Sequence, residues 1–113
     1  AAAGGVANAV RLCRKGAPHP LKVEVEVRTE AELDEALAAG ADCIMLDNMT
    51  TDQMARCVRE VKGRAILEAS GGVSIETVAA IAATGVDIIS VGAFTHSAPA
   101  ADISFLIDGV APL

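Results

Sequence analysis

The fold is decided by residues 23–47, VEVEVRTEAELDEALAAGADCIMLD. This stretch begins with alternating valine and glutamate, which is typical of a β-strand with one apolar and one polar face. Apolar residues at helical spacing follow, and a second apolar run from Cys43 to Leu46 ends the stretch. A strand, a helix and a strand joined by short turns form a right-handed βαβ unit, so the two strands are predicted to be parallel.

The rest of the chain repeats this unit. An opening helix is predicted at Val6–Lys15, and four strands are predicted at Val23–Val27, Cys43–Leu46, Ala65–Ala69 and Ile88–Val91. Polar residues are expected to cap three of the helices, in two capping boxes (Thr29 with Glu32, Thr50 with Gln53) and at Ser74. Helix ends are expected at glycines that accept a left-handed backbone: Gly40, Gly63 and Gly85.

Acidic residues recur along the predicted strands. Glu26, Asp47 and Glu68 are 21 residues apart, and each is expected to close a strand. In an α/β barrel the valine face would meet the helices and the face with Glu24 and Glu26 would point inside, with the active site at the carboxyl ends of the strands. Four strands cannot close a barrel and would leave two unpaired edges. Residues 1–113 are therefore expected to be one partial barrel domain, the back half of something larger.

Glycine-rich turns follow the third and fourth predicted strands. Ser70-Gly71-Gly72 precedes a predicted helix, and Val91-Gly92-Ala93 follows the last strand. The backbone N–H groups of such turns can bind a phosphate. Either cluster alone is more often an ordinary turn, but two of them on adjacent strand ends, beside two carboxylates, favour a phosphate site. His96 comes after the last strand and is expected near that phosphate or bonded within its own loop.

Composition excludes several classes of function. A net charge of −6 argues against a surface for nucleic acid or anionic membranes, and the chain has no apolar run long enough to span a bilayer. Two Phe and no Trp or Tyr argue against base stacking. Three cysteines without C-x-x-C spacing predict a reduced, cytoplasmic compartment and no structural zinc. Of the nine Lys and Arg residues, only Arg28 is expected near the carboxyl ends of the strands, so an anionic substrate must find further cations elsewhere.

Other acidic residues have structural explanations. Asp42 and Asp87 precede their strands at the amino ends, where a role in stability is expected. Glu24 and Glu68 are expected to line the interior of the barrel or to bond with its missing half.

Four motifs together resemble a known family. They are KVEVEV (Lys22–Val27), IMLDNM (Ile44–Met49), LEASGGV (Leu67–Val73) and SVGAFTHSAP (Ser90–Pro99). In order and spacing, from Ala1 to about Ile107, the chain resembles the C-terminal part of quinolinate phosphoribosyltransferase, also called nicotinate-nucleotide pyrophosphorylase (carboxylating). The resemblance implies α/β architecture: parallel βα repeats that form the C-terminal part of the incomplete, TIM-like barrel of a type II phosphoribosyltransferase.

The resemblance also implies an activity in NAD biosynthesis. The family converts quinolinate and phosphoribosyl pyrophosphate, with Mg²⁺, to nicotinate mononucleotide, pyrophosphate and CO₂, and a homodimer or higher homo-oligomer is implied. The implied ligands of the metal and of the ribose are Glu26 and Asp47. The implied phosphate-binding residues are those of the two glycine turns: Ser70, Gly71, Gly72, Val91, Gly92 and Ala93.

The family's other active-site residues are absent from the chain. In the family, basic residues that bind quinolinate lie upstream of the stretch that resembles Ala1–Gly5, and a further arginine comes from the partner subunit. Residues 1–113 alone are therefore expected not to catalyse the full reaction. The alternative is a non-catalytic half-barrel that binds phosphate or assembles with a complementary half. Another phosphate-binding barrel enzyme would explain the glycine turns but not the joint spacing of the four motifs.

Overall fold

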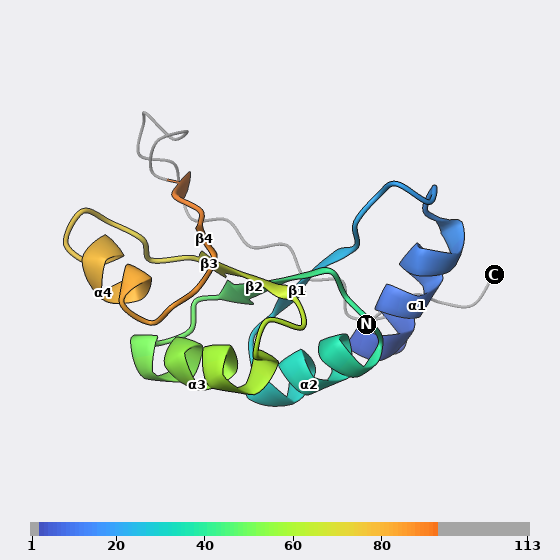
Figure 1. Cartoon of the computed structure of the whole chain (residues 1–113), viewed down its shortest axis with the longest axis horizontal. Helices are drawn as coiled ribbons and strands as arrows, with labels where there is room; N and C mark the ends of the chain where they lie inside the picture. The colour runs from blue at the N-terminus through green and yellow to red at the C-terminus, as the bar shows by residue number, and fades with distance from the viewer. Residues whose placement is uncertain (1–2, 93–113) are drawn as a thin grey trace, which may run out of the picture.

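One parallel sheet organises the chain (Figure 1). A computed structural model describes residues 3–92. The strands are β1 (Glu24–Val27), β2 (Cys43–Asp47), β3 (Ile66–Ser70) and β4 (Ile88–Ile89), in the order β1-β2-β3-β4. The helices are α1 (Val6–Gly16), α2 (Glu30–Ala38), α3 (Thr51–Val61) and α4 (Val78–Ala82). This sequential parallel order confirms the predicted βα repeats. None of these helices has the length and apolar character needed to cross a membrane.

Local bonds fix the starts of α2 and α3 as predicted. The Thr29 hydroxyl accepts a hydrogen bond from the Glu32 amide at 3.2 Å, and the Glu32 carboxylate accepts one from the Thr29 amide at 3.2 Å. Thr50 and Gln53 form the same reciprocal pair, at 3.3 and 2.9 Å. Both capping boxes satisfy amides that the first helical turn leaves without partners.

The prediction that Ser74 caps α4 is wrong. The residue at the N-cap position is Thr77, and its side chain makes no capping bond. Instead the Thr77 hydroxyl accepts from the Ser74 amide at 2.8 Å and donates to the Gly72 carbonyl at 3.0 Å. These hydroxyl bonds stabilise the turn after β3, so the helix begins three residues later than the sequence indicates. The fourth strand is also shorter than predicted, because its ladder with β3 ends at the pair Ala69–Ile89.

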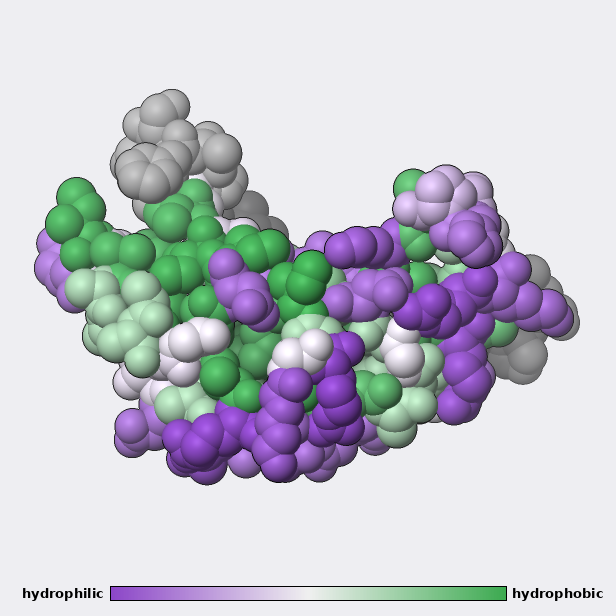
Figure 2. Space-filling view, in the orientation of Figure 1, coloured by the Kyte–Doolittle hydropathy of each residue, from purple (hydrophilic) through white to green (hydrophobic). Residues whose placement is uncertain are grey.

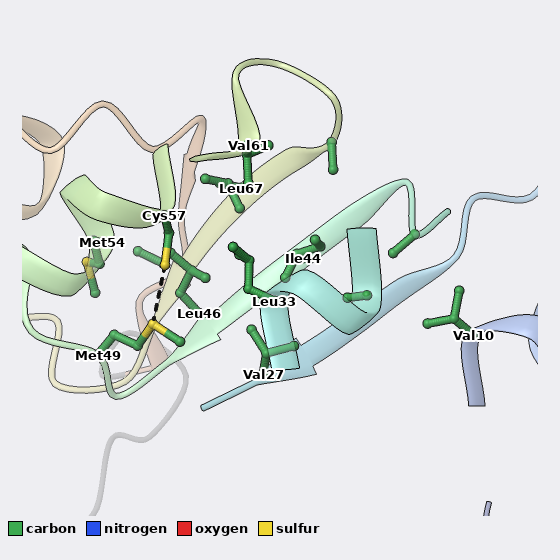
Figure 3. Close-up of a cluster of buried hydrophobic side chains, with 14 of the residues drawn as sticks. Val10, Val27, Leu33, Ile44, Leu46, Met49, Met54, Cys57, Val61 and Leu67 are labelled. Atoms are coloured by element: carbon green, nitrogen blue, oxygen red, sulfur yellow. Dashed lines mark hydrogen bonds between the residues drawn. The ribbon is translucent and has the colours of Figure 1, made fainter. Parts of the chain in front are cut away.

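The hydrophobic core lies between the sheet and its helices. Figure 1 shows α2 and α3 along one face of the sheet, and in Figure 2 hydrophilic residues cover the lower border of this view, where α2 and α3 lie. The largest fully buried side chains include Leu33 of α2, Ile44 and Leu46 of β2, and Met54 of α3 (Figure 3). Burying each such side chain contributes about 1.5–3 kcal/mol. A slip of one residue in a strand would turn these side chains to the other face, so their burial fixes the register.

The strand register separates the three carboxylates that are evenly spaced in the sequence. Glu26 lies opposite Met45, which in turn lies opposite Glu68, whereas Asp47 lies opposite Ser70. Of the three, only Asp47 ends its strand, so the prediction that each carboxylate closes a strand is wrong for Glu26 and Glu68. Equal spacing fails because the paired positions are 19 residues apart between β1 and β2 (Glu26 to Met45) and 23 residues apart between β2 and β3 (Met45 to Glu68). The longer α3, with 11 residues against 9 in α2, accounts for part of this difference.

Candidate functional site

One guanidinium joins the two carboxylates at the carboxyl ends of β1 and β2. Arg28 donates from Nη2 to Glu26 Oε1 at 3.1 Å and from Nε to Asp47 Oδ2 at 3.0 Å. The Asp47 side chain is 16% exposed and that of Arg28 is 72% exposed, so a sheltered carboxylate meets a surface cation. The hydrogen bond to Asp47, and then the charges of Asp47 and Glu26, raise the pKa of Arg28. The structure thus brings Glu26, Asp47 and Arg28 together at the predicted end of the sheet.

Asn48 holds the second oxygen of Asp47. Its side-chain amide donates to Asp47 Oδ1 at 2.9 Å, and its backbone amide donates to the Ser70 carbonyl at 2.9 Å. Asn48 has a left-handed backbone, with φ +53°. Asparagine is one of the few residues with a side chain that tolerate this conformation. Sequence reasoning overlooked Asn48, although an asparagine directly after a strand-ending aspartate was the available signal.

The turn Ser70-Gly71-Gly72 lies beside Asn48. Gly71 has φ +82°, and a Cβ there would lie 2.9 Å from Asn48 Nδ2 and closer still to the rest of that carboxamide. Gly72 has φ +62°, but a Cβ there would have no atom within 4 Å. Within residues 3–92 no hydrogen bond uses the amide of Gly71 or Gly72. The turn that the sequence predicts to bind phosphate therefore presents two backbone donors that have no partner in the described part of the chain.

The second predicted phosphate turn is described only in part. Val91 is half-buried and Gly92 is exposed, and both follow β4. Ser90 donates its backbone amide to the Ala69 carbonyl at 2.9 Å, which keeps this segment beside β3. Ala93 and His96 lie outside the described residues, so their predicted roles stay predictions.

A second polar cluster lies on the same face of the sheet, where Glu24 and Cys43 are the first residues of β1 and β2. Ligand atoms of Glu24, Cys43 and Glu68 are all within 4.8 Å of one another, and Glu68 also accepts a hydrogen bond from the Ser90 hydroxyl. Burial, followed by the charge of Glu68, raises the pKa of Glu24, and burial raises the pKa of the Cys43 thiol. Such a donor set could hold a metal ion. Sequence reasoning did not associate Cys43 with these glutamates, although strand alternation places Cys43, Met45 and Asp47 on one face.

Comparison with known proteins gives a consistent assignment. Residues 1–106 match the family model described as quinolinate phosphoribosyl transferase, C-terminal domain. The chain is 42% identical over 104 residues to the probable nicotinate-nucleotide pyrophosphorylase (carboxylating) of Bacillus subtilis, covering 92% of this chain and 36% of that protein. It is 39% identical over 106 residues to the human nicotinate-nucleotide pyrophosphorylase (carboxylating), covering 91% and 36%.

A solved structure agrees with this match. The nicotinate-nucleotide pyrophosphorylase of Francisella tularensis superposes with a TM-score of 0.78 at 45% identity, over 82% of this chain and 33% of that one. The chain thus spans roughly a third of the length of these relatives. From Ala1 to Leu106 it matches the model of the family's C-terminal domain. The chain belongs to the quinolinate phosphoribosyltransferase family.

Proposed function

We propose that this chain supplies the ribose-binding, metal-binding and phosphate-binding residues of an enzyme that makes nicotinate mononucleotide from quinolinate and phosphoribosyl pyrophosphate. One observation carries the proposal. Two carboxylates from adjacent strands, Glu26 and Asp47, converge on a single cation at the carboxyl end of the sheet. Active sites of α/β barrels lie at this end.

The two carboxylates fit a magnesium ion. Mg²⁺ prefers oxygen ligands, and Glu26 and Asp47 offer carboxylate oxygens that already share one positive group. Asn48 holds one oxygen of Asp47 and thereby orients the other. These two carboxylates would hold the ion, which would supply positive charge to neutralise the departing pyrophosphate.

The chain's own groups suit a reaction in which C1 of the ribose becomes positively charged. The bond from C1 to the pyrophosphate oxygen breaks, and the quinolinate nitrogen forms the new bond to C1. Glu26 and Asp47 hold ribose hydroxyls and stabilise the positive charge that develops at C1. The electron pair of the bond to the adjacent carboxylate stays on that ring carbon, next to the positive ring nitrogen that stabilises it; CO₂ leaves, and a proton from solvent adds to the carbon to complete nicotinate mononucleotide. No nucleophilic side chain is needed.

The amides of Gly71 and Gly72 bind a phosphate of the substrate in this proposal. They carry no protein partner within the described residues, and the Thr77 hydroxyl holds the Gly72 carbonyl in place. Backbone donors fixed in this way bind phosphate without reorganising. The carboxylates of quinolinate need further cations, which the rest of the subunit or a partner subunit supplies, since Arg28 is the cation seen at this end of the described sheet.

Asp47→Asn tests this function in the intact natural protein. The variant keeps the size of the side chain but loses the charge that binds the metal and stabilises C1. We expect kcat/KM for phosphoribosyl pyrophosphate to fall by about 10²–10³-fold, with the melting temperature close to wild type. Asp34→Asn is the matched control, because Asp34 is exposed on α2 and away from the site.

Two results would contradict the proposal. A kcat/KM for Asp47→Asn within a fewfold of the Asp34→Asn value would remove Asp47 from the catalytic groups. A wild-type protein that binds phosphate but forms no nicotinate mononucleotide would favour the non-catalytic half-barrel.

A further inference from the structure

Arg28 combines a backbone that is held by a hydrogen bond with a side chain that is exposed. Its backbone amide donates to Glu32 Oε2 at 2.8 Å, the same carboxylate oxygen that completes the capping box of α2. The side chain is 72% exposed, and within residues 3–92 its ion pairs are those with the carboxylates of Glu26 and Asp47. The guanidinium can therefore leave these carboxylates while its backbone stays in place.

The electrostatics favour such an exchange. Two carboxylates that share one site repel each other unless a cation lies between them. An exposed ion pair contributes little net stability and is screened by salt, whereas a divalent cation binds two carboxylates directly. The guanidinium and a metal ion would need the same oxygens, so both cannot hold them at once.

We propose that Arg28 is a resident counter-cation of the Glu26–Asp47 pair, which a divalent metal ion must displace when it binds. The proposal rests on the proposed function, because it takes these two carboxylates as metal ligands. Arg28 keeps the pair together in the absence of metal and raises the metal concentration needed to fill the site. The identity of residue 28 thus sets the apparent affinity for metal without contributing a ligand.

Titration with Mn²⁺ alone tests the competition. The concentration of free Mn²⁺ is measured by electron paramagnetic resonance in solutions of the intact natural protein and of its Arg28→Gln variant. The control is Arg56→Gln, which removes the same charge from another surface ion pair, that of Arg56 with Glu30 at 2.8 Å between α3 and α2. We expect Arg28→Gln to lower the Kd for Mn²⁺ about 3–10-fold more than Arg56→Gln does.

A conservative variant adds a second readout. Lysine keeps the charge but offers one ammonium in place of a planar fork, so it cannot bond both carboxylates with separate nitrogens of fixed geometry. We expect the Kd of Arg28→Lys to lie between those of wild type and Arg28→Gln. Because Arg28→Lys retains the positive charge beside the carboxylates, it can still be compared with wild type if Arg28→Gln folds poorly.

The outcomes distinguish this proposal from the proposed function. If Arg28→Gln binds Mn²⁺ no more tightly than Arg56→Gln, or more weakly than wild type, Arg28 is not a competitor of the metal and the proposal is overturned. A separate titration uses Asp47→Asn, which is expected to abolish the binding of Mn²⁺. If Mn²⁺ binding survives Asp47→Asn unchanged, the assignment of metal ligands fails, and the role of Arg28 fails with it.

Discussion

Gly71 and Gly72 share a left-handed backbone but differ in their surroundings. At Gly71 the Asn48 carboxamide fills the space that a side chain would need, and at Gly72 that space is empty. Gly71 is thus required by packing as well as by its φ of +82°, whereas Gly72 is required only by its φ of +62°. A substitution at Gly71 therefore tests the structural function of the turn, and a substitution at Gly72 tests its binding function.

Gly71→Ala and Gly72→Ala are expected to have different effects. A left-handed alanine costs about 1–2 kcal/mol at either position. Gly71→Ala adds the overlap with Asn48, and we expect a total loss of about 2–4 kcal/mol in the free energy of unfolding, measured with urea. In a double-mutant cycle with Asn48→Gly, which removes the carboxamide and accepts the left-handed backbone of residue 48, the part of the loss that is due to overlap should appear as coupling energy.

Gly72→Ala tests the phosphate site itself. Its methyl group would project into open space in front of the turn, so we expect the Kd for phosphoribosyl pyrophosphate to rise about tenfold while the protein stays folded. Gly72→Asn is the control for backbone strain, because asparagine tolerates the left-handed region but still adds a side chain. A Kd that is unchanged in both well-folded variants would identify an ordinary turn.

Part of the site could be predicted residue by residue, and part could not. The residue types and strand positions of Glu26 and Asp47 were sufficient to place both at one end of the sheet, because parallel strands share their carboxyl ends. That Arg28 bridges the two carboxylates depends on the side-chain rotamer and on the register, in which Asp47 lies opposite Ser70. Neither is encoded in the spacing of the motifs.

Two aspartates connect the amino ends of neighbouring strands by hydrogen bonds. Asp42 accepts a hydrogen bond from the Val23 amide at 2.8 Å, and Asp87 accepts one from the Leu67 amide at 2.8 Å. In both cases a residue before one strand bonds the start of the preceding strand. Asp42 also pairs with Arg14 of α1 at 2.8 Å, so it connects the sheet to the first helix. These bonds agree with the stability role expected from the sequence.

Asp42→Ala is expected to lower stability in a pH-dependent manner. The hydrogen bond from the Val23 amide, assisted by Arg14, lowers the pKa of Asp42 in the folded protein. A lowered pKa contributes stability above the unfolded value of about 3.9 and loses it as the pH falls through the folded value. We therefore expect a melting temperature several degrees below wild type at pH 7 and a difference that shrinks below about pH 4.

The exposed Asp34 of α2 provides the comparison for this variant. Asp34→Ala removes the same charge without a bonded amide, and its melting temperature should follow that of wild type at every pH. A difference between Asp42→Ala and wild type that stays constant from neutral to acidic pH would show that the charge of Asp42 is not what stabilises the strands.

Elements with strong local signals were predictable, and those fixed by tertiary geometry were not. The alternation in β1 and the capping boxes of α2 and α3 are local patterns, and the structure confirms them. The start of α4 depends on whether Ser74 bonds the helix or the Thr77 hydroxyl, and both choices fit the sequence equally well. The positions of the carboxylates along the sheet depend on the strand register, which is set by the lengths of both the helices and the loops and is not visible in the constant interval of the sequence.

The whole sheet is asymmetric, with helices on one face and titratable groups on the other. Glu24, Glu68 and the half-buried Met45 lie on the face without helices in the described part of the chain. Within residues 3–92, β1 and β4 each pair along one edge only. Ile88 of β4 is 43% exposed beside Glu68. This arrangement leaves strand edges and an incompletely buried face, which are features that promote association.

Residues 1–113 produced by themselves are therefore expected to self-associate and to form no nicotinate mononucleotide. Sedimentation velocity should show species larger than the 11.4 kDa monomer. Ile88→Lys should shift these species toward the monomer, because a lysine at the edge opposes strand pairing. The expected inactivity has a separate cause: in the described part, Arg28 is the cation at the carboxyl end of the sheet, and it already neutralises Glu26 and Asp47. The carboxylates of quinolinate would have no counter-charge there. A monomeric preparation that turns over substrate would contradict both expectations, and a monomeric but inactive one would contradict the first alone.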